Sequence, residues 1–248
     1  MQKVKPSIKM LSEKPDVQKD EFGLDIAEMA KAGLHFGQRT SKTHPKMLPY
    51  VFGVRNAIHV IDLEKTLPVF REALQFIRSL AADKKKILFV GTKIQHKDAV
   101  RKTAEACEMP YVTERWLGGT FTNFGIMAKR IEHLKELEQK KAEGALAQYT
   151  KKERARIDEE MERLDKKFHG IKNIEKLPDA IFVCDINKEA GAIKEARMKG
   201  IPVIGICDTN ADPTRVNFAI PANDDAISSV RYILDKIRET ILGATKND

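Results

Sequence analysis

Short apolar runs alternate with amphipathic stretches along most of this 248-residue chain. Runs of this length, rich in Val and Ile and bounded by turn residues, are typical of buried strands. They predict six strands, near residues 58–61, 86–90, 111–113, 180–185, 202–208 and 218–220. Because helical patterns separate most of these runs, the sequence predicts an α/β fold with a parallel, doubly wound sheet.

The stretches between the strands carry apolar residues at helical spacing. The longest begins after Asp62, a residue type that favours the first cap of a helix. Its apolar positions recur at four- and three-residue steps, at Leu63, Leu67, Phe70, Leu74 and Ile77. Similar patterns predict helices near 25–33, 95–107, 189–199 and 224–242, whereas residues 35–49 are expected to form a polar loop.

A highly charged stretch at 124–171 interrupts this alternation. Its apolar residues keep the three- and four-residue spacing of paired helices, at Phe124, Met127, Ile131 and Leu134 and again at Ile157, Met161, Leu164 and Phe168. Breaks near Gly144 and Thr150 predict that the two helices fold back as an inserted antiparallel hairpin, a coiled coil. The pair could lie packed on the core, but dense charge beside a narrow apolar seam favours a projecting arm.

These patterns divide the chain into three parts. Residues 1–24 are expected to be a mobile basic tail, because they contain two prolines, five lysines and few large apolar residues. Residues 25–123 and 172–248 are expected to form the α/β domain, and residues 124–171 the hairpin. No apolar run approaches the roughly 20 residues of a bilayer span, and the N-terminus lacks a signal-peptide core, so we expect a cytoplasmic protein.

The three cysteines, Cys107, Cys184 and Cys207, have no paired spacing, and the six histidines are scattered without ligand spacing. Cys184 and Cys207 lie inside apolar runs and are expected to be small core residues. The pattern predicts neither a disulfide framework nor a metal site, and no cofactor is expected.

Charge is distributed unevenly along the chain. Of its 44 basic and 36 acidic residues, 10 and 12 lie within 175–248, so the preceding part holds 34 and 24. A basic part beside a mildly acidic one is typical of a protein with one face on a polyanion, although a lysine-rich surface can also serve solubility alone.

Two segments offer chemistry suited to RNA. The stretch from Arg115 to Phe124 holds the only tryptophan of the chain, a glycine pair and further aromatics, and arginine beside aromatics suits phosphate contact and stacking. The segment 37–55 contains Arg39, Lys42, Lys46 and Arg55 and no acidic residue. The stretch from Arg115 to Phe124 carries no nucleophile beside a base, which favours a binding protein.

An enzyme remains the competing interpretation. In parallel α/β sheets ligands bind beyond the carboxyl ends of strands, and here Lys93, Asp185 and Asp208 follow three predicted strands. They could hold Mg²⁺ and a phosphate. However, the chain has no Gly-x-Gly-x-x-Gly after a strand and no Walker spacing before Lys93, and strand-terminal Asp is an ordinary turn former. A stand-alone RNA-binding regulator is a third possibility.

Several long motifs also resemble one family in a single order. They include Ala32-Gly-Leu-His-Phe-Gly37, Pro49-Tyr-Val-Phe-Gly53, Ile87-Leu-Phe-Val-Gly-Thr-Lys93, Arg115-Trp-Leu-Gly-Gly119 with Thr122-Asn-Phe124, and Pro221-Ala-Asn-Asp-Asp-Ala226. Together they resemble the S-two family of bacterial small-subunit ribosomal proteins from residue 25 to residue 242. Gln38 departs from the pattern, since the family more often has a second histidine there.

This resemblance implies a flavodoxin-like α/β domain with an inserted helical hairpin. It also implies a non-enzymatic component of the small ribosomal subunit that acts in translation. Such proteins bind small-subunit rRNA on the solvent side between head and body, contact neighbouring ribosomal proteins, and help to dock the OB-repeat ribosomal protein numbered one. The matching basic positions are Lys46, Arg55, Lys93 and Arg115. The expected RNA contacts are completed by Trp116 and Asn123 of the Arg115 motif and, on charge alone, by Arg39, Lys42 and Arg130.

Overall fold

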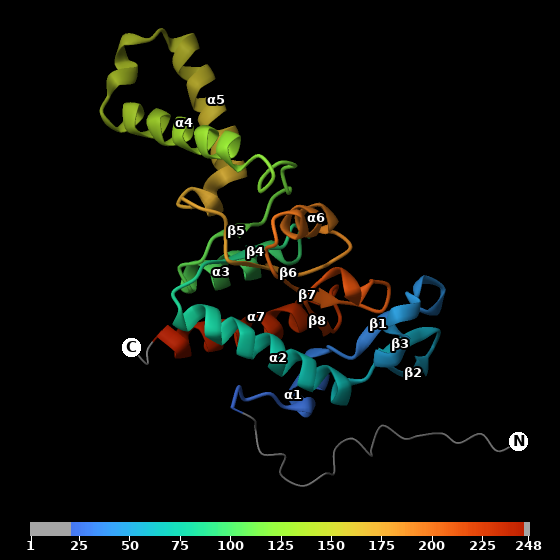
Figure 1. Ribbon diagram of the computed structural model, residues 1–248. Helices are drawn as coiled ribbons and strands as arrows, with labels where there is room; N and C mark the ends of the chain where they lie inside the picture. Colours follow the sequence, from blue (N-terminus) through green and yellow to red (C-terminus); the bar gives the residue numbers. More distant parts are fainter. Residues whose placement is uncertain (1–20, 246–248) are drawn as a thin grey trace, which may run out of the picture.

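The computed structural model describes residues 21–245 (Figure 1), so residues 1–20 of the expected tail lie outside the described part. Its main sheet has five strands, β4 (Ile87–Val90), β5 (Tyr111–Val112), β6 (Ala180–Val183), β7 (Val203–Cys207) and β8 (Phe218–Pro221). All neighbouring strands are parallel and their order is β5-β4-β6-β7-β8. This is the strand order of flavodoxin-like folds, which confirms the flavodoxin-like α/β sheet of the predicted fold class.

Helices cover both faces of this sheet. Along β4, Ile87 and Phe89 enter one core, whereas Leu88 and Val90 enter the other, because alternate side chains of a strand point to opposite faces. The first core is closed by α1 (Ile26–Ala32), α2 (Leu63–Ala82), α3 (Lys97–Ala106) and α7 (Ile227–Thr245), and the second by α6 (Ala190–Met198). Strands buried on both faces explain the continuous apolar runs of the sequence.

The predicted helix boundaries have identifiable caps. The carboxylate of Asp25 accepts a hydrogen bond from the backbone N–H of Ala27 at 2.9 Å, and that of Asp62 accepts one from Glu64 at 3.1 Å. Gly33 ends α1 with a φ of 83°, a left-handed conformation that glycine adopts without steric cost. The two aspartates and this glycine therefore place α1 and α2 as the sequence predicted.

A second, antiparallel sheet of order β1-β3-β2 lies beside the carboxyl end of β7. It consists of β1 (Phe36–Arg39), β2 (Val51–Arg55) and β3 (Ile58–Ile61), with the 3-10 helices η2 (Thr40–Lys42) and η3 (Pro45–Tyr50) between β1 and β2. Only β3 was predicted. The expectation of a loop at 35–49 was wrong for β1, because a four-residue strand with a glycine and two polar residues shows no alternating pattern.

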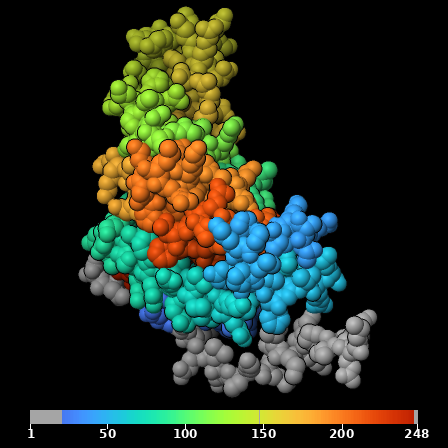
Figure 2. Space-filling view, turned by 45° about the vertical axis from the view of Figure 1, so that its right-hand side comes forward, coloured from blue at the N-terminus to red at the C-terminus, as the bar shows by residue number. Residues whose placement is uncertain are grey.

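The charged insertion forms two helices, α4 (Phe124–Ala142) and α5 (Lys151–Phe168), joined by η4 (Ala145–Gln148). Thr150 and Glu153 form a reciprocal capping box at the start of α5. The two helices contact each other, and Lys141 on α4 pairs with Asp158 on α5 at 2.6 Å. In both whole-molecule views they extend away from the sheets (Figures 1 and 2).

The base of this insertion is part of the domain core. Met127, Ile131 and Leu134 of α4 are buried in the same cluster as Leu88 and Val90 of β4. The outer apolar residues of α5 at Ile157, Met161 and Leu164 are only half buried. The apolar seam nevertheless extends beyond the base, because Leu137 of α4 and Leu146 of η4 are also buried.

The chain returns to the sheet through η5 (His169–Ile171), which packs on β5. Gly170 comes so close to that strand that an added Cβ would lie 2.2 Å from the carbonyl oxygen of Tyr111. Only a residue without a side chain allows this approach.

Two further observations concern the cysteines and the helices. Cys184 and Cys207 are buried, as predicted, and all three thiols are free. Among residues 21–245, no helix is both long and apolar enough to cross a bilayer.

Candidate nucleic-acid interface

The segment after β5 takes its shape from one acidic residue on a different element. The carboxylate of Glu195 on α6 accepts five hydrogen bonds from this segment, from the backbone N–H groups of Gly119, Phe121 and Thr122, the Thr122 hydroxyl and the Trp116 indole. Their lengths range from 2.8 to 3.1 Å. Burial alone would raise the pKa of Glu195, but these donors outweigh it and lower the pKa.

The aromatic residues of this segment face inward more than its charged and polar ones. Phe121 is buried, and Trp116 packs edge-on against it with ring centroids 5.0 Å apart. Arg115 and Asn123, in contrast, are exposed. The inward rings and Glu195 thus form a rigid base on which Arg115 and Asn123 face solvent.

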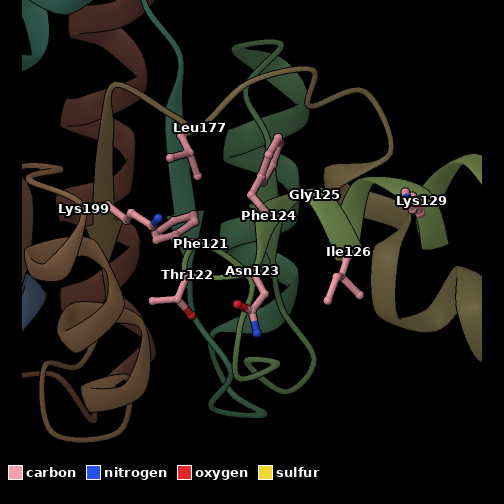
Figure 3. Close-up of a pocket in the computed structure, with 9 residues that line it drawn as sticks. All are labelled: Phe121, Thr122, Asn123, Phe124, Gly125, Ile126, Lys129, Leu177 and Lys199. Carbon is pink, nitrogen blue, oxygen red and sulfur yellow. The ribbon is translucent and has the colours of Figure 1, made fainter.

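The start of α4 borders a shallow cavity of about 420 Å³ (Figure 3). The residues that line it come from the end of this segment, the first turns of α4 and two distant loops: Phe121, Thr122, Asn123, Phe124, Gly125, Ile126, Lys129, Leu177 and Lys199. Asn123 precedes the helix without capping it through its side chain. The positive end of the α4 dipole and two lysines therefore give this concave surface a positive potential.

The acid-free segment supplies a second group of exposed cations. Arg39, Lys42 and Arg55 are exposed at the small sheet and its connection. Lys46 is also exposed, but its ammonium lies 3.0 Å from Asp212 and donates to the Thr214 hydroxyl at 2.7 Å. Hydrogen bonds from Thr214 and Lys46 hold the pKa of Asp212 well below its usual range, so the charge of Lys46 is already compensated within the chain.

Lys93 lies among carboxylates at the carboxyl ends of the parallel strands. Its ammonium is 2.7 Å from Asp185, 2.9 Å from Asp224 and 2.8 Å from Asp225. Burial alone would lower the pKa of Lys93, but the attraction of these carboxylates outweighs it and raises the pKa. A cation this deeply paired is a weaker candidate for a phosphate contact than the exposed arginines.

The same crevice is where doubly wound folds bind ligands, because the strand order reverses between β4 and β6. Here the Glu189 carboxylate accepts both the backbone N–H of Thr92, at 2.9 Å, and its hydroxyl, at 2.7 Å. These are the groups that a phosphate would use after β4. The crevice is therefore filled by contacts within the chain.

Three carboxylates near this crevice could converge on a cation. Side-chain oxygens of Asp208, Asp224 and Asp225 lie within 4.8 Å of one another. Burial, together with the nearby charges of Asp185 and Asp208, raises the pKa of Asp224 to about 8. Gln38 donates its amide hydrogens to Asp208 at 3.1 Å and to Asp225 at 2.6 Å, so hydrogen bonds and the Lys93 ammonium already compensate this cluster.

The two exposed cationic segments lie along one edge of the main sheet. Arg115 follows β5, and the small sheet packs against Thr209, which follows β7. Three strand spacings of about 4.8 Å separate β5 from β7, so the ends of these two strands are roughly 15 Å apart. Arg130 lies farther out on α4, where it is exposed.

Sequence reasoning missed the acidic residues that position these groups. Glu195 occupies the buried stripe of α6 together with Ala192 and Ala196, and an acid on an apolar helical face was the available signal. Glu189 gave no such signal, because it precedes α6 directly and resembles an ordinary first-turn acid.

Comparison with known proteins gives an independent view of the chain. The family model described as Ribosomal protein S2 matches residues 29–244. A curated relative, the small ribosomal subunit protein uS2 of Koribacter versatilis (strain Ellin345), is 44% identical over 218 residues. The match covers 88% of this chain and 72% of that relative.

Proposed function

The chain belongs to the ribosomal protein S2 family, and from this premise we propose that it binds small-subunit ribosomal RNA along the carboxyl edge of its parallel sheet. Membership in this family identifies the chain as a protein of the small ribosomal subunit that acts in translation. The family is generally non-enzymatic. The RNA contacts proposed here are finer than the family assignment, and they rest on the surface described above.

The observation that supports this proposal is the separation between exposed and internally paired cations. Arg39, Lys42, Arg55 and Arg115 are exposed at one edge, whereas Lys93 is held by three carboxylates. Exposed arginines are suited to phosphate, because the guanidinium matches its geometry with two parallel hydrogen bonds. We propose phosphate and 2′-hydroxyl contacts, since side chains cannot read the deep major groove of A-form RNA.

The inserted helices and the domain are proposed to have separate roles. We propose that α4 and α5 act as a coiled-coil arm on an α/β domain formed by 25–123 and 172–248, reaching a second RNA element or a protein. The ion pairs between Lys141 and Asp158 and between His133 and Glu160 support mutual packing beyond the buried base. Exposed Arg130 would contact RNA from α4, and Asn123 and Trp116 would complete the contact at its start.

The proposed place of the protein in the subunit follows the family resemblance. We propose that it lies on the solvent side between head and body, beside other small-subunit proteins, and supports docking of the OB-repeat ribosomal protein numbered one. Its mildly acidic part, residues 175–248, would stay available to protein neighbours. The proposed location is the ribosome in the cytoplasm.

Binding of purified protein to small-subunit rRNA across a salt series tests this proposal, with ATP, GTP and NADH titrated alongside. Steep salt dependence is expected, because each phosphate contact releases counterions. Tight nucleotide binding with weak, salt-insensitive RNA binding would instead favour an enzyme that uses the strand-end crevice. Sedimentation of the native protein with small subunits, rather than free of them, separates a ribosomal component from a stand-alone regulator.

A further inference from the structure

One face of the small antiparallel sheet combines exposed apolar side chains with two arginines. Residues directly opposite each other in antiparallel strands project from the same face. The pairing therefore forms two rows, Phe36–Val60–Gly53 and Arg39–Ile58–Arg55. Ile58 and Val60 are two residues apart, so both rows lie on one side, here called the outer face.

The two faces of this sheet differ in exposure along β3. On the outer face, Phe36 is 51% exposed and Ile58 is 38% exposed. On the opposite face, His59 and Ile61 are 6% and 1% exposed, whereas Val54, which pairs with His59, is 58% exposed. The rest of the domain thus covers the inner face along β3 but not at Val54 of β2, and the outer face leaves an aromatic ring in solvent. Figure 2 shows the segment that carries this sheet, in blue, as a lobe at the side of the molecule.

Gly53 lies in the middle of β2, where no side chain covers the backbone. A Cβ built at this position meets no atom within 4 Å, and its φ lies outside the left-handed region. The glycine is therefore required neither by the turn nor by packing inside the chain. Its absent side chain leaves room for a flat group to approach beside Val60, and the adjacent Phe52 is 75% exposed.

The hairpin turn fixes the two arginines relative to this apolar row. Asn56 and Ala57 both have positive φ, 50° and 61°, as a tight two-residue turn requires. This turn holds Arg55 opposite Ile58. On the other side, the backbone N–H of Thr40 donates to the Ala57 carbonyl at 3.0 Å and holds the chain next to Arg39.

Charge identifies the chemical class of the partner. No acidic residue occurs in 29–61, which contains all three strands, and Lys42 adds an exposed cation. A polyanion fits this charge, but the phosphates and riboses of a duplex would leave the apolar row unused because duplex bases are covered. Unpaired nucleotides present both phosphate charge and open base faces, which stack on aromatic rings.

Resting on the proposed function, we infer that the outer face of the small sheet binds unpaired nucleotides of ribosomal RNA. Bases stack on Phe36 and against the bare backbone at Gly53. Arg39 and Arg55 hold the adjoining phosphates. This surface recognises a different RNA feature from the phosphate contacts of Arg115.

Gly53→Val tests this inference in the full-length protein, because valine suits a strand and finds open space at this position. Phe36→Leu is the second variant, which removes the ring and keeps an apolar side chain. Gly243→Val is the matched control, since Gly243 also has no atom within 4 Å of an added Cβ and lies in α7. Thermal unfolding of all variants verifies folding before small-subunit rRNA is titrated.

Both test variants are expected to weaken rRNA binding by about 5- to 150-fold, the range for the loss of one stacked base. The salt slope should stay constant, because no charge changes. Base-modifying reagents should regain access to unpaired bases that the wild-type protein protects. The Gly243→Val control should match the wild type in all three measurements.

Other outcomes separate this inference from the proposal on which it rests. If the wild-type protein binds rRNA but both test variants keep its affinity and base protection, the inference is overturned and the proposed function stands. If the variants keep RNA affinity but fail to enter small subunits, the outer face belongs to a protein neighbour, and the inference is again overturned. If the wild-type protein binds no rRNA, both fail together.

Discussion

The indole N–H of Trp116 donates to the carboxylate of Glu195 at 3.1 Å and joins the segment after β5 to α6. Four polar hydrogens of the following turn, from Gly119, Phe121 and Thr122, also bond to that carboxylate. One buried acid thus substitutes for regular secondary structure in positioning Arg115 and Asn123. The glycine pair contributes less than its prominence suggests, since only Gly119 has a positive φ, of 91°.

Glu195→Gln should destabilise the protein by roughly 1–3 kcal/mol, because a neutral amide cannot accept all five hydrogen bonds and brings two hydrogens of its own. RNA affinity should also fall, since the variant side chain would no longer hold the segment that carries Arg115 and Asn123 in place. Chemical denaturation and rRNA titration measure the two effects. Glu72→Gln on the exposed side of α2 is the control, and an equal loss there would show that Glu195 has no special role.

Arg115→Ala should lower the salt slope of rRNA binding by about one counterion. Lys46→Ala should change the slope much less, because Asp212 already compensates the Lys46 charge. Exposed Arg231 on α7 provides a control away from the proposed edge. Equal decreases in the salt slope for Arg115→Ala and Lys46→Ala would mean that Lys46 separates from Asp212 when RNA binds.

His96 should make stability depend on pH. It is fully buried, and burial followed by the Lys93 charge lowers its pKa to about 4, from an ordinary value near 6.5. The unfolded chain therefore binds a proton that the folded protein excludes. The contribution of His96 to the free energy of unfolding is at most about 3 kcal/mol. It is fully present above pH 6.5 and is lost as pH falls toward 4.

Urea unfolding at pH 7, 5.5 and 4.5 measures this dependence, and His96→Leu should remove its contribution. His133→Leu replaces a half-exposed histidine on α4 and should retain the wild-type pH dependence. If the wild type and His96→Leu lose stability in parallel, acid destabilisation arises elsewhere.

Shortening the inserted helices should separate their base from their tip. Replacing residues 139–159 by a short Gly-rich linker keeps Ile131, Leu134 and Phe168, which are buried in the core. This variant should unfold within a few degrees of the wild type yet enter small subunits poorly. Removing 124–168 entirely should destabilise the domain strongly, because it exposes β4 and loses several buried side chains.

Thermal unfolding and incorporation into small subunits are the two measurements. Normal incorporation of the shortened protein would remove the arm from the proposed function. Severe destabilisation of the shortened protein would show that the outer helices are themselves part of the core.

The sequence predicted the parallel sheet well because strands such as β4 and β6 are buried on both faces and read as continuous apolar runs. It predicted both ends of α1 and the start of α2 to within a residue, since Asp25, Asp62 and Gly33 act locally. It failed at β1, whose partner strand supplies pairing that Phe36–Arg39 does not encode locally.

The sequence predicted which segment supplies the cations of the candidate site, but not which of these cations face solvent. An acid-free segment is visible in any sequence, but whether its cations face solvent depends on residues far along the chain. Lys46 meets Asp212 and Lys93 meets Asp224 across separations of 166 and 131 residues. Charge counting therefore treats Arg55 and Lys93 alike, although folding leaves one exposed and pairs the other.

The close approach of Gly170 to Tyr111 also affects one open edge of the main sheet. The main sheet ends at β5, and an open edge strand is a template for pairing with other chains. This edge is only two residues long, and η5 packs against it through the glycine. This edge of the sheet is thereby protected from pairing with another chain.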